Sequence, residues 1–453
     1  MTASTSATDV EKLQPQDVST LSESKEQSVK PLPNIIDLYP GLPPVDRGRA
    51  AWLYLAAAFV VEVLTIGFSF SFGRFQDFYS TNEPFAGSSN IAVIGVLNQG
   101  LIFICLPVTV HLARRKPEWA RWFATGGLLG AFVSNIASSF CTTITQLIGT
   151  QGVLLGVCGS FAFCPLLVFA DQWFDKRKGL AFGIIGSGAG LGGLFLPLIF
   201  NALLYNVGFR TTMRIWAGIL FVIGIPLAYF VRPRLPPSAT EKKPFWNLRA
   251  VRSRFFILNS IANLFQGAGY YLPGIYLPTF TREVFGASTW LATLSLMLLN
   301  LSAMMGLIIM GHFTDRWNSR TCIFISAFGA TIAVFLFWGL AVHLSVLYLF
   351  CIFFGLFSGC FPAVWPAVMR ETARRGEERG FGYVDTLMCY SLLCVGRGIG
   401  NIISGPLSEA LIDGMPWKGE AIGGYGSGFG ALIVFSGLTS LVSGMNTLWY
   451  HLL

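Results

Sequence analysis

Two ionisable side chains stand inside long apolar stretches of this sequence, where a charge is costly and therefore indicates a chemical task. Glu62 lies ten residues into the apolar run that begins at Trp52, and Arg397 lies in a later run between Gly396 and Gly398. A carboxylate at such a depth can carry a proton or contact a substrate, and a guanidinium can bind an anion. Each can also be structural, Glu62 by bonding to a neighbouring helix and Arg397 by pairing with Glu62 or with backbone carbonyls.

A row of uncharged polar side chains follows one face of another apolar run. Asn259, Asn263, Gln266 and Tyr270 stand at spacings of four, three and four residues, which a helix places on one face. Lipid cannot satisfy such groups, so this face is expected to look toward a neighbouring helix or to line a cavity that receives a substrate. Trp365, which lies between two prolines, is an aromatic candidate for the same cavity, and core packing is its equal alternative.

The segment 173–193 joins a basic cluster to a glycine-rich apolar stretch. Its last residues satisfy the spacing GxGxxG, but a dinucleotide-binding turn needs a strand before it, and these glycines lie inside a long apolar run. The four-residue spacings of Gly179 with Gly183 and of Gly186 with Gly190 predict instead a helix face that a second helix approaches closely. We therefore expect no nucleotide and no other cofactor. The four histidines, at ends of apolar runs or near the terminus, do not predict an enzyme.

The composition of the chain indicates a membrane protein that crosses the bilayer many times. Its 453 residues are 53% hydrophobic and only 12% charged, whereas soluble domains carry about 25% charged residues. The net charge of +8 resides in short loops between apolar runs, which argues against nucleic-acid binding. The nine cysteines lie in or beside apolar segments without metal-ligand spacing, so we expect small buried side chains and no metal site.

Apolar runs long enough to cross a bilayer recur along the chain. A helix needs about 20 apolar residues to span the hydrocarbon core. We predict twelve such helices, at residues 52–75, 91–112, 120–142, 147–170, 180–204, 211–231, 255–280, 288–311, 320–342, 344–368, 383–407 and 426–449. The predicted fold class is an all-α membrane protein with twelve transmembrane helices in two six-helix bundles.

The predicted domains follow from these runs. Residues 1–46 are polar and are expected to form a disordered cytoplasmic tail. An N-terminal bundle occupies residues 47–231, a basic cytoplasmic linker 232–254, and a C-terminal bundle 255–453. Lys and Arg concentrate in the loops after the even-numbered runs, so both termini are expected in the cytoplasm. The plasma membrane is the default location, because no retention signal ends the chain.

Two motifs carry a family resemblance. The stretch WFDKRKGLAFGIIGSGAG, which begins at Trp173, resembles the signature of the monocarboxylate porters, a branch of the major facilitator superfamily. The stretch from Gly311 through Asp315 and Arg316 to Arg320 is similar to the loop motif of that superfamily. The resemblance implies alternating access of two six-helix halves around a central cavity. That cavity is lined by runs one, four, seven and ten, so the resemblance favours the cavity for the polar face of run seven.

The resemblance also gives the charged loops a role. In this superfamily, charged residues of the loops between helices form ion pairs that hold one conformation and break in the other. The matching residues here are Asp175, Lys176, Arg177, Asp315 and Arg316. The alternative is that these loops only anchor the chain by their positive charge.

Run eight departs from the family pattern. The characterised lactate carriers present an Asp and an Arg four residues apart in this run, and the matching positions here are Asn300 and Met304. Many fungal relatives place an arginine where this chain has Leu307. The anion-binding pair of the family is therefore missing, and the resemblance does not carry a lactate-like substrate over to this chain.

These observations support more than one function. The main hypothesis is proton-linked transport of a small organic acid, in which Glu62 carries the proton and Arg397 holds the anion. The alternative is export of a larger, less charged secondary metabolite, which the uncharged face of run seven and the 40 Phe residues favour. A third class is a membrane sensor or scaffold, which predicts a long folded cytosolic extension. The expected partners are a small-molecule substrate, the lipid bilayer and protons, and an accessory protein is left open.

Overall fold

Every regular element that the structure describes is a helix. The computed structural model describes residues 41–88, 90–237 and 247–445, and residues 43–453 form one compact unit. Most of the predicted tail 1–46 therefore lies outside the described residues. Its last residue, Asp46, is described and is tied to the rest of the chain by a backbone hydrogen bond of 3.0 Å from its N–H to the carbonyl of Trp173.

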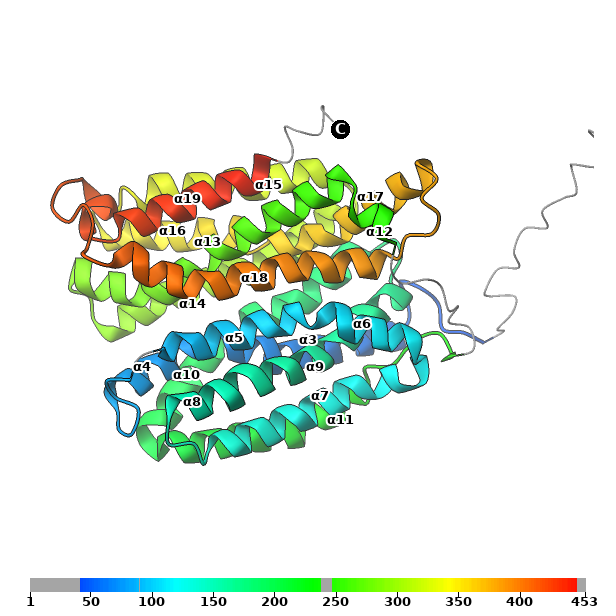
Figure 1. Ribbon diagram of the computed structural model, residues 1–453, viewed down its shortest axis with the longest axis horizontal. Coiled ribbons are helices and arrows are strands. Elements are labelled where there is room, and N and C mark those ends of the chain that lie inside the picture. Colours follow the sequence, from blue (N-terminus) through cyan, green and yellow to red (C-terminus); the bar gives the residue numbers. More distant parts are fainter. Residues whose placement is uncertain (1–40, 89, 238–246, 446–453) are drawn as a thin grey trace, which may run out of the picture. The chain divides into compact units, whose positions relative to one another are not determined.

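The first half of the chain forms helices that match the first six apolar runs. They are α3 (Arg49–Phe70), α4 (Phe72–Thr81), α5 (Ile91–Ile104), α6 (Leu106–Arg115), α7 (Pro117–Ser138), α8 (Ile144–Leu147), the π-helical η1 (Ile148–Leu154), α9 (Leu155–Trp173), α10 (Lys178–Ile219), the π-helical η2 (Leu220–Gly224) and α11 (Ile225–Ala228). Several runs are broken into consecutive helical pieces that continue in one direction, as α3 and α4 do in Figure 1.

The second half repeats this pattern. Its helices are α12 (Leu248–Val251), α13 (Arg254–Phe285), α14 (Thr289–Thr314), α15 (Ser319–Ile332), the π-helical η4 (Ala333–Trp338), α16 (Leu344–Ser358), η5 (Phe361–Val364), α17 (Trp365–Glu378), α18 (Thr386–Ile412), η6 (Gly423–Ser427) and α19 (Gly430–Met445). The short helix α12 lies within the predicted linker. Helix α17 continues ten residues past the predicted end of its run, and within this extension Glu371 pairs with Arg374 and Arg375, three and four residues later, at 2.9 and 2.8 Å.

The described helices account for all twelve predicted crossings. Eight helical stretches are long and apolar enough to span a membrane, and one of them, Lys178–Ala228, contains two predicted runs. These two runs separate at Gly208, whose φ of 77° is a conformation that glycine adopts without strain. Helices α7, α13 and α19 supply the remaining three. The predicted all-α membrane fold with twelve spans is confirmed.

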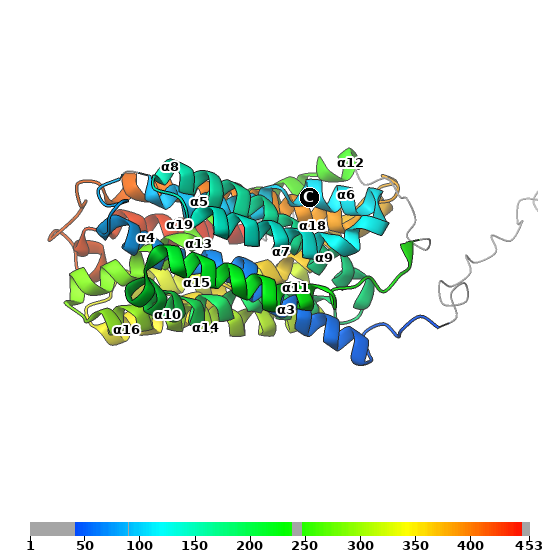
Figure 2. The ribbon, with the colours of Figure 1, turned by 90° about the horizontal axis from the view of Figure 1, so that it is seen from below.

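The helices lie in two layers. Figure 1 draws α3 to α11 below and α13 to α19 above, and Figure 2 shows the long helices running along a common direction from a second side. Glycines let helices of the two layers meet closely, as where Gly398 of α18 faces the carbonyl of Gly100 in α5. Residues 47–231 and 255–453 are the predicted N-terminal and C-terminal bundles. Because residues 43–453 form one unit, the domain boundaries themselves stay a prediction.

The glycine face of α10 packs as its spacing predicts. A side chain at Gly183 would collide with the carbonyl oxygen of Leu307 in α14, and one at Gly190 would lie 2.9 Å from the Cβ of Met304 in the same helix. On the opposite side of α10, a side chain on Gly67 of α3 would come within 2.8 Å of the Cα of Gly192. Helix α10 is thus held between α3 and α14 by contacts that only glycines permit, and it joins the two layers.

Candidate functional site

Three cavities that share lining residues lead from one end of the helices to their middle. The widest, of about 450 Å³, lies at the end where α4 and α13 finish and is lined by charged side chains that include Arg74, Asp77, Arg282 and Glu409. We call it the vestibule. It shares Phe70 and the neighbouring residues Gly73 and Gln76 with a second, middle cavity. Phe70 also lines the third and deepest cavity, so this one residue borders all three cavities.

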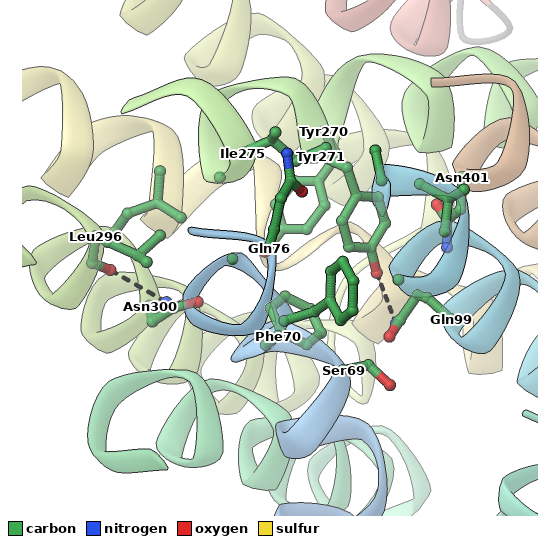
Figure 3. Close-up of a pocket in the computed structure, with 17 residues that line it drawn as sticks. Ser69, Phe70, Gln76, Gln99, Tyr270, Tyr271, Ile275, Leu296, Asn300 and Asn401 are labelled. Atoms are coloured by element: carbon green, nitrogen blue, oxygen red, sulfur yellow. Dashed lines mark hydrogen bonds between the residues drawn. The ribbon is translucent and has the colours of Figure 1, made fainter. Parts of the chain in front are cut away.

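The middle cavity is lined by uncharged polar and aromatic side chains from both layers (Figure 3). Gln99 of α5 donates a hydrogen bond of 2.8 Å from its Nε2 to the hydroxyl of Tyr271 in α13, and this bond crosses between the layers. Asn300 of α14 donates from its Nδ2 to the carbonyls of Leu296 and Gly193, each at 3.1 Å. This wall offers hydrogen bonds and flat apolar surface, and its described lining contains no ionisable acid or base stronger than a tyrosine.

The deep cavity contains Glu62, Arg397 and Trp365, three of the residues that the sequence singled out. Glu62, on α3, is 2% exposed, and its Oε2 has no hydrogen-bond partner among the described residues. The α3–α10 packing fixes its position, because Gly188 of α10 lies directly against its side chain. The alternative that Glu62 is bonded to a neighbouring helix is not supported for this oxygen, which has no hydrogen-bond partner among the described residues.

Arg397 is held by an amide and by aromatic rings. Its Nη1 donates to Oε1 of Gln266, and its guanidinium carbon lies 4.8 Å from the ring centre of Tyr270, 5.6 Å from that of Tyr271 and 5.9 Å from that of Trp365. Such rings attract a cation through their negative faces. No ion pair within 4.0 Å joins Arg397 to a carboxylate in the described part of the chain, so the pairing with Glu62 that the sequence allowed is not formed in this conformation.

The polar face of α13 divides between packing and cavity. Asn263 donates to the carbonyl of Leu393 in α18, and Gln266 donates at 3.1 Å to that of Ser358 at the end of α16, while its Oε1 holds Arg397. Asn259 donates at 2.8 Å to a carbonyl of its own helix. Tyr270 lines both the middle and the deep cavity. Of the two expectations for this face, contact with a neighbouring helix therefore describes Asn263 and Gln266, and a cavity lining describes Tyr270.

Aromatic side chains close the deep cavity on the side away from the vestibule. The rings of Trp365 and Tyr390 meet edge to face at 5.4 Å, Tyr390 contacts Phe182 at 5.2 Å, and Phe103 contacts Trp365 at 6.5 Å. All four side chains are buried. They come from α5, α10, α17 and α18, so the closure is made jointly by the two layers. The three cavities thus share walls from the vestibule to the deep cavity, and these aromatic contacts border the deep cavity.

Two carboxylates fasten the layers together at the closed end, and we call these contacts the latches. Asp315, after α14, accepts hydrogen bonds from the backbone N–H groups of Gly179 and Leu180 at 2.6 and 2.9 Å, and it lies 3.7 Å from Arg370. Asp385, before α18, pairs with Arg114 of α6 at 3.2 Å. Both carboxylates sit at helix N-termini, where unpaired N–H groups and the helix dipole favour negative charge.

The other predicted loop residues act differently from Asp315. The backbone N–H groups of Asp175, Lys176 and Arg177 donate to the carboxylate of Asp46 at 3.1, 3.1 and 3.0 Å, while their side chains are exposed. Arg316 is exposed as well. Among the residues that the structure describes, no ion pair joins these four side chains to a partner. The predicted conformational role therefore has a geometric basis at Asp315 alone.

Sequence reasoning missed several residues of the site. Gln99, Tyr271, Tyr390 and Asn401 line the cavities but were not singled out, and the Arg114–Asp385 latch was not foreseen. Some signals were present, because Gln99 is an amide inside an apolar run. Asp385 directly precedes a helix, and its carboxylate accepts from the N–H of Leu387 at 2.9 Å, as an N-cap does.

Comparison with known proteins agrees with this architecture. The family model described as Major Facilitator Superfamily matches residues 91–394. The chain is 31% identical over 297 residues to the MFS-type transporter pynF of Aspergillus niger, which covers 65% of this chain and 68% of that protein. It is 29% identical over 273 residues to the aspyridones efflux protein apdF of Emericella nidulans, covering 60% and 55%. It is 28% identical over 404 residues to the agnestins efflux protein AgnL12 of Paecilomyces divaricatus, covering 88% and 87%.

The family assignment and the geometry agree on the class of the molecule. Long apolar helices make this chain an integral membrane protein with many crossings, and cavities that share lining residues lie between its two layers. The matched model spans most of the chain and includes the helices that build the cavity. The chain belongs to the major facilitator superfamily of membrane transporters.

Proposed function

We propose that this chain exports a secondary metabolite of low charge by alternating access. The observation that carries the proposal is the cavity wall, which combines amides, a carboxylate oxygen without a partner among the described residues and many rings, and which is reached from one end only. Two relatives are named as efflux proteins, one for aspyridones and one for agnestins. A large, flat and weakly charged cargo suits such a wall better than a small anion, which needs a dedicated charged clamp.

The main hypothesis from the sequence, transport of a small organic acid as in the monocarboxylate porters, has less support. The positions of the family's acid and base in run eight are Asn300 and Met304. Arg397, the remaining candidate for an anion contact, already bonds Gln266 and lies against three rings. A carboxylate substrate would have to displace these contacts, and the gain from the new ion pair would be reduced by that loss.

Glu62 is the proposed proton carrier of the export cycle. It is buried, it lines the deep cavity, and one of its oxygens has no partner among the described residues. Protonation of Glu62 therefore changes the charge of the cavity wall that the cargo would contact. Export driven by an inward proton gradient needs a group that binds a proton in one conformation and releases it in the other. Among the described residues, no other carboxylate lines the deep cavity.

The proposed orientation places the latches on the cytoplasmic side. Basic residues concentrate in the loops at this end, including Arg114, Lys176 and Arg370, and cytoplasmic loops carry an excess of Lys and Arg. The vestibule then opens to the outside, and we propose the plasma membrane as the location. In this conformation the cargo has access to the exterior while both latches are closed.

The experiment that tests export is a comparison of metabolites in cells with and without the protein. We expect a compound to accumulate inside cells that lack it and to decline in the medium, and expression of the intact chain should restore secretion. The control is expression of the Asp315→Ala variant, which returns the protein to the membrane but lacks the Asp315 latch. Equal intracellular and extracellular profiles in the two strains would count against export.

A further inference from the structure

Four buried polar side chains of the deep cavity each have an atom without a hydrogen-bond partner in the described residues. These atoms are Oε2 of Glu62, Oε1 of Gln99, Oδ1 of Asn300 and Nε1 of Trp365. All four side chains line the deep cavity, and their exposed fractions are 2, 4, 1 and 2%. They come from α3, α5, α14 and α17, so each layer of the molecule contributes two.

For two of these side chains, Asn300 and Trp365, chemistry fixes which atom is unpaired and whether it donates or accepts. Asn300 cannot exchange its amide ends, because its Nδ2 already donates to two backbone carbonyls and its Oδ1 must therefore remain the free acceptor. Trp365 can only donate. Buried polar atoms of this kind are normally paired, and leaving several of them unpaired around one cavity is unfavourable unless a ligand or water completes them.

We propose that the cargo is an uncharged planar compound with several free hydroxyl or N–H groups, which bridges the two layers through these atoms. Its donors bond Asn300 and Glu62, and one of its oxygens accepts from Trp365. This inference rests on the proposed function, because it names the chemistry of the compound that is exported. It excludes a fully alkylated compound, which has no donors, and it gives no role to a carboxylate.

The rings of the path fit the body of such a compound. Phe70 lines all three cavities, and its ring lies 5.7 Å from that of Tyr271, which itself contacts Tyr270 at 5.2 Å. Figure 3 shows Phe70 and Tyr271 side by side, between the amides of Gln99 and Asn300. A conjugated ring system can lie against these faces while its edge reaches the amides, since aromatic groups pair at ring-centre separations of about 4.5–7 Å.

The contacts of Arg397 also argue against a negatively charged cargo. Its guanidinium is engaged by Gln266 and three rings, and it forms one wall of the cavity. A cation surrounded by aromatic faces is already stabilised and does not need a charge from the ligand. A neutral compound with donors can therefore occupy the site without displacing an existing contact, which a carboxylate cannot.

The test is a binding experiment on the full chain in phosphatidylcholine nanodiscs. The probes are resveratrol, a planar stilbene with free phenolic hydroxyls, its fully methylated ether, and a stilbene monocarboxylate, and binding is measured by equilibrium dialysis. We expect resveratrol to bind at least about tenfold more tightly than either of the other two, because the ether has no donors and the carboxylate needs a free cation. Equal binding of resveratrol and its ether, tightest binding of the carboxylate, or no binding of resveratrol would overturn the proposal.

Variants with matched controls locate the effect. Asn300→Ala should weaken resveratrol binding about fivefold and leave the ether unchanged, because only resveratrol donates to that side chain. Trp365→Phe should weaken resveratrol binding by a similar factor and also weaken binding of the ether, whose oxygens can still accept from the indole N–H. Asn135→Ala and Trp338→Phe are the controls, because these side chains also hold an unpaired buried atom but do not line the described cavities. Trp365→Phe keeps the ring, so it remains informative if Asn300→Ala disturbs folding. Unchanged resveratrol binding in both cavity variants contradicts the proposal.

The binding test and the metabolite comparison fail independently. If cells without the protein secrete the same compounds as cells that have it, the export function is wrong even when the probe preference is observed. If a compound is retained in those cells but the nanodisc probes show no preference for free hydroxyls, the export function stands and the inference about the cargo is wrong.

Discussion

At the scale of single residues, the site depends on buried polar groups that keep free hydrogen-bonding capacity. Glu62 illustrates this, because a carboxylate that is 2% exposed and has an unpaired oxygen is unfavourable unless it serves a task. Arg397 shows the opposite arrangement, since an amide and three rings compensate its charge. The two residues that looked equivalent in the sequence therefore have different proposed roles. Glu62 is available to exchange a proton, and Arg397 shapes the wall.

The first prediction concerns Glu62. Glu62→Gln keeps the size of the side chain but cannot bind or release a proton, so we expect transport to become independent of external pH. We also expect its rate to fall at least about tenfold, which corresponds to roughly 1.4 kcal/mol in the barrier. The measurement is efflux of the exported compound from cells at several values of external pH, with surface expression checked by labelling. If the Glu62→Gln variant keeps the pH response of the wild type, Glu62 is not the proton carrier.

At the scale of elements, the site is assembled by helices that come unusually close. Helix α10 packs against α14 of the other layer through Gly183 and Gly190, and against α3 through Gly188 and Gly192. Close approach without side chains is the means by which membrane helices associate when lipid supplies no hydrophobic driving force. The packing against α3 positions Glu62, and the packing against α14 positions Asn300, so the glycines of one helix set two walls of the cavity.

A second prediction follows for α10. Gly183→Ala adds a methyl group that collides with the carbonyl of Leu307, and we expect a loss of stability of about 1–3 kcal/mol, seen as a lower unfolding temperature of the purified protein in detergent. Gly186→Ala is the matched control on the same helix, because its added methyl group would lie 3.8 Å from the Leu307 side chain, an ordinary contact. Equal unfolding temperatures for the two variants would show that the α10–α14 contact does not limit stability.

At the scale of the whole molecule, the structure is asymmetric between its ends. The vestibule is open, whereas the aromatic closure around Trp365 and the two latches shut the other end. Asp315 lies beside the N-terminus of a helix in the opposite layer, and Asp385 beside that of a helix in its own layer. A transporter needs such contacts to be breakable, because the closed end must open when the vestibule closes.

The third prediction concerns the Asp315 latch. Asp315→Ala removes the acceptor of two backbone N–H groups and the partner of Arg370, so the conformation with an open vestibule should become less populated. Ser80 lines the vestibule, and a Ser80→Cys substitution reports access to it. We expect a membrane-impermeant maleimide to label this cysteine several-fold more slowly when Asp315→Ala is also present.

The control for the latch is Arg316→Ala. Arg316 is the next residue in the same loop motif, but its side chain is exposed and forms no ion pair with the described residues. This variant should therefore leave the labelling rate of the Ser80→Cys protein unchanged. If Arg316→Ala slows labelling as much as Asp315→Ala does, the effect belongs to the charge of the loop and not to the latch.

The amino-acid sequence by itself determined the twelve helices, because about 20 apolar residues and the spacing of small residues are local properties of the chain. It also singled out Glu62, Arg397 and Trp365 as candidates, since polar or bulky groups in apolar runs are conspicuous without any structure. The tertiary structure decided which groups are free. Whether Asn300 or Gln266 keeps an unpaired atom depends on carbonyls that other helices bring within about 3 Å, and no pattern along the chain specifies that distance.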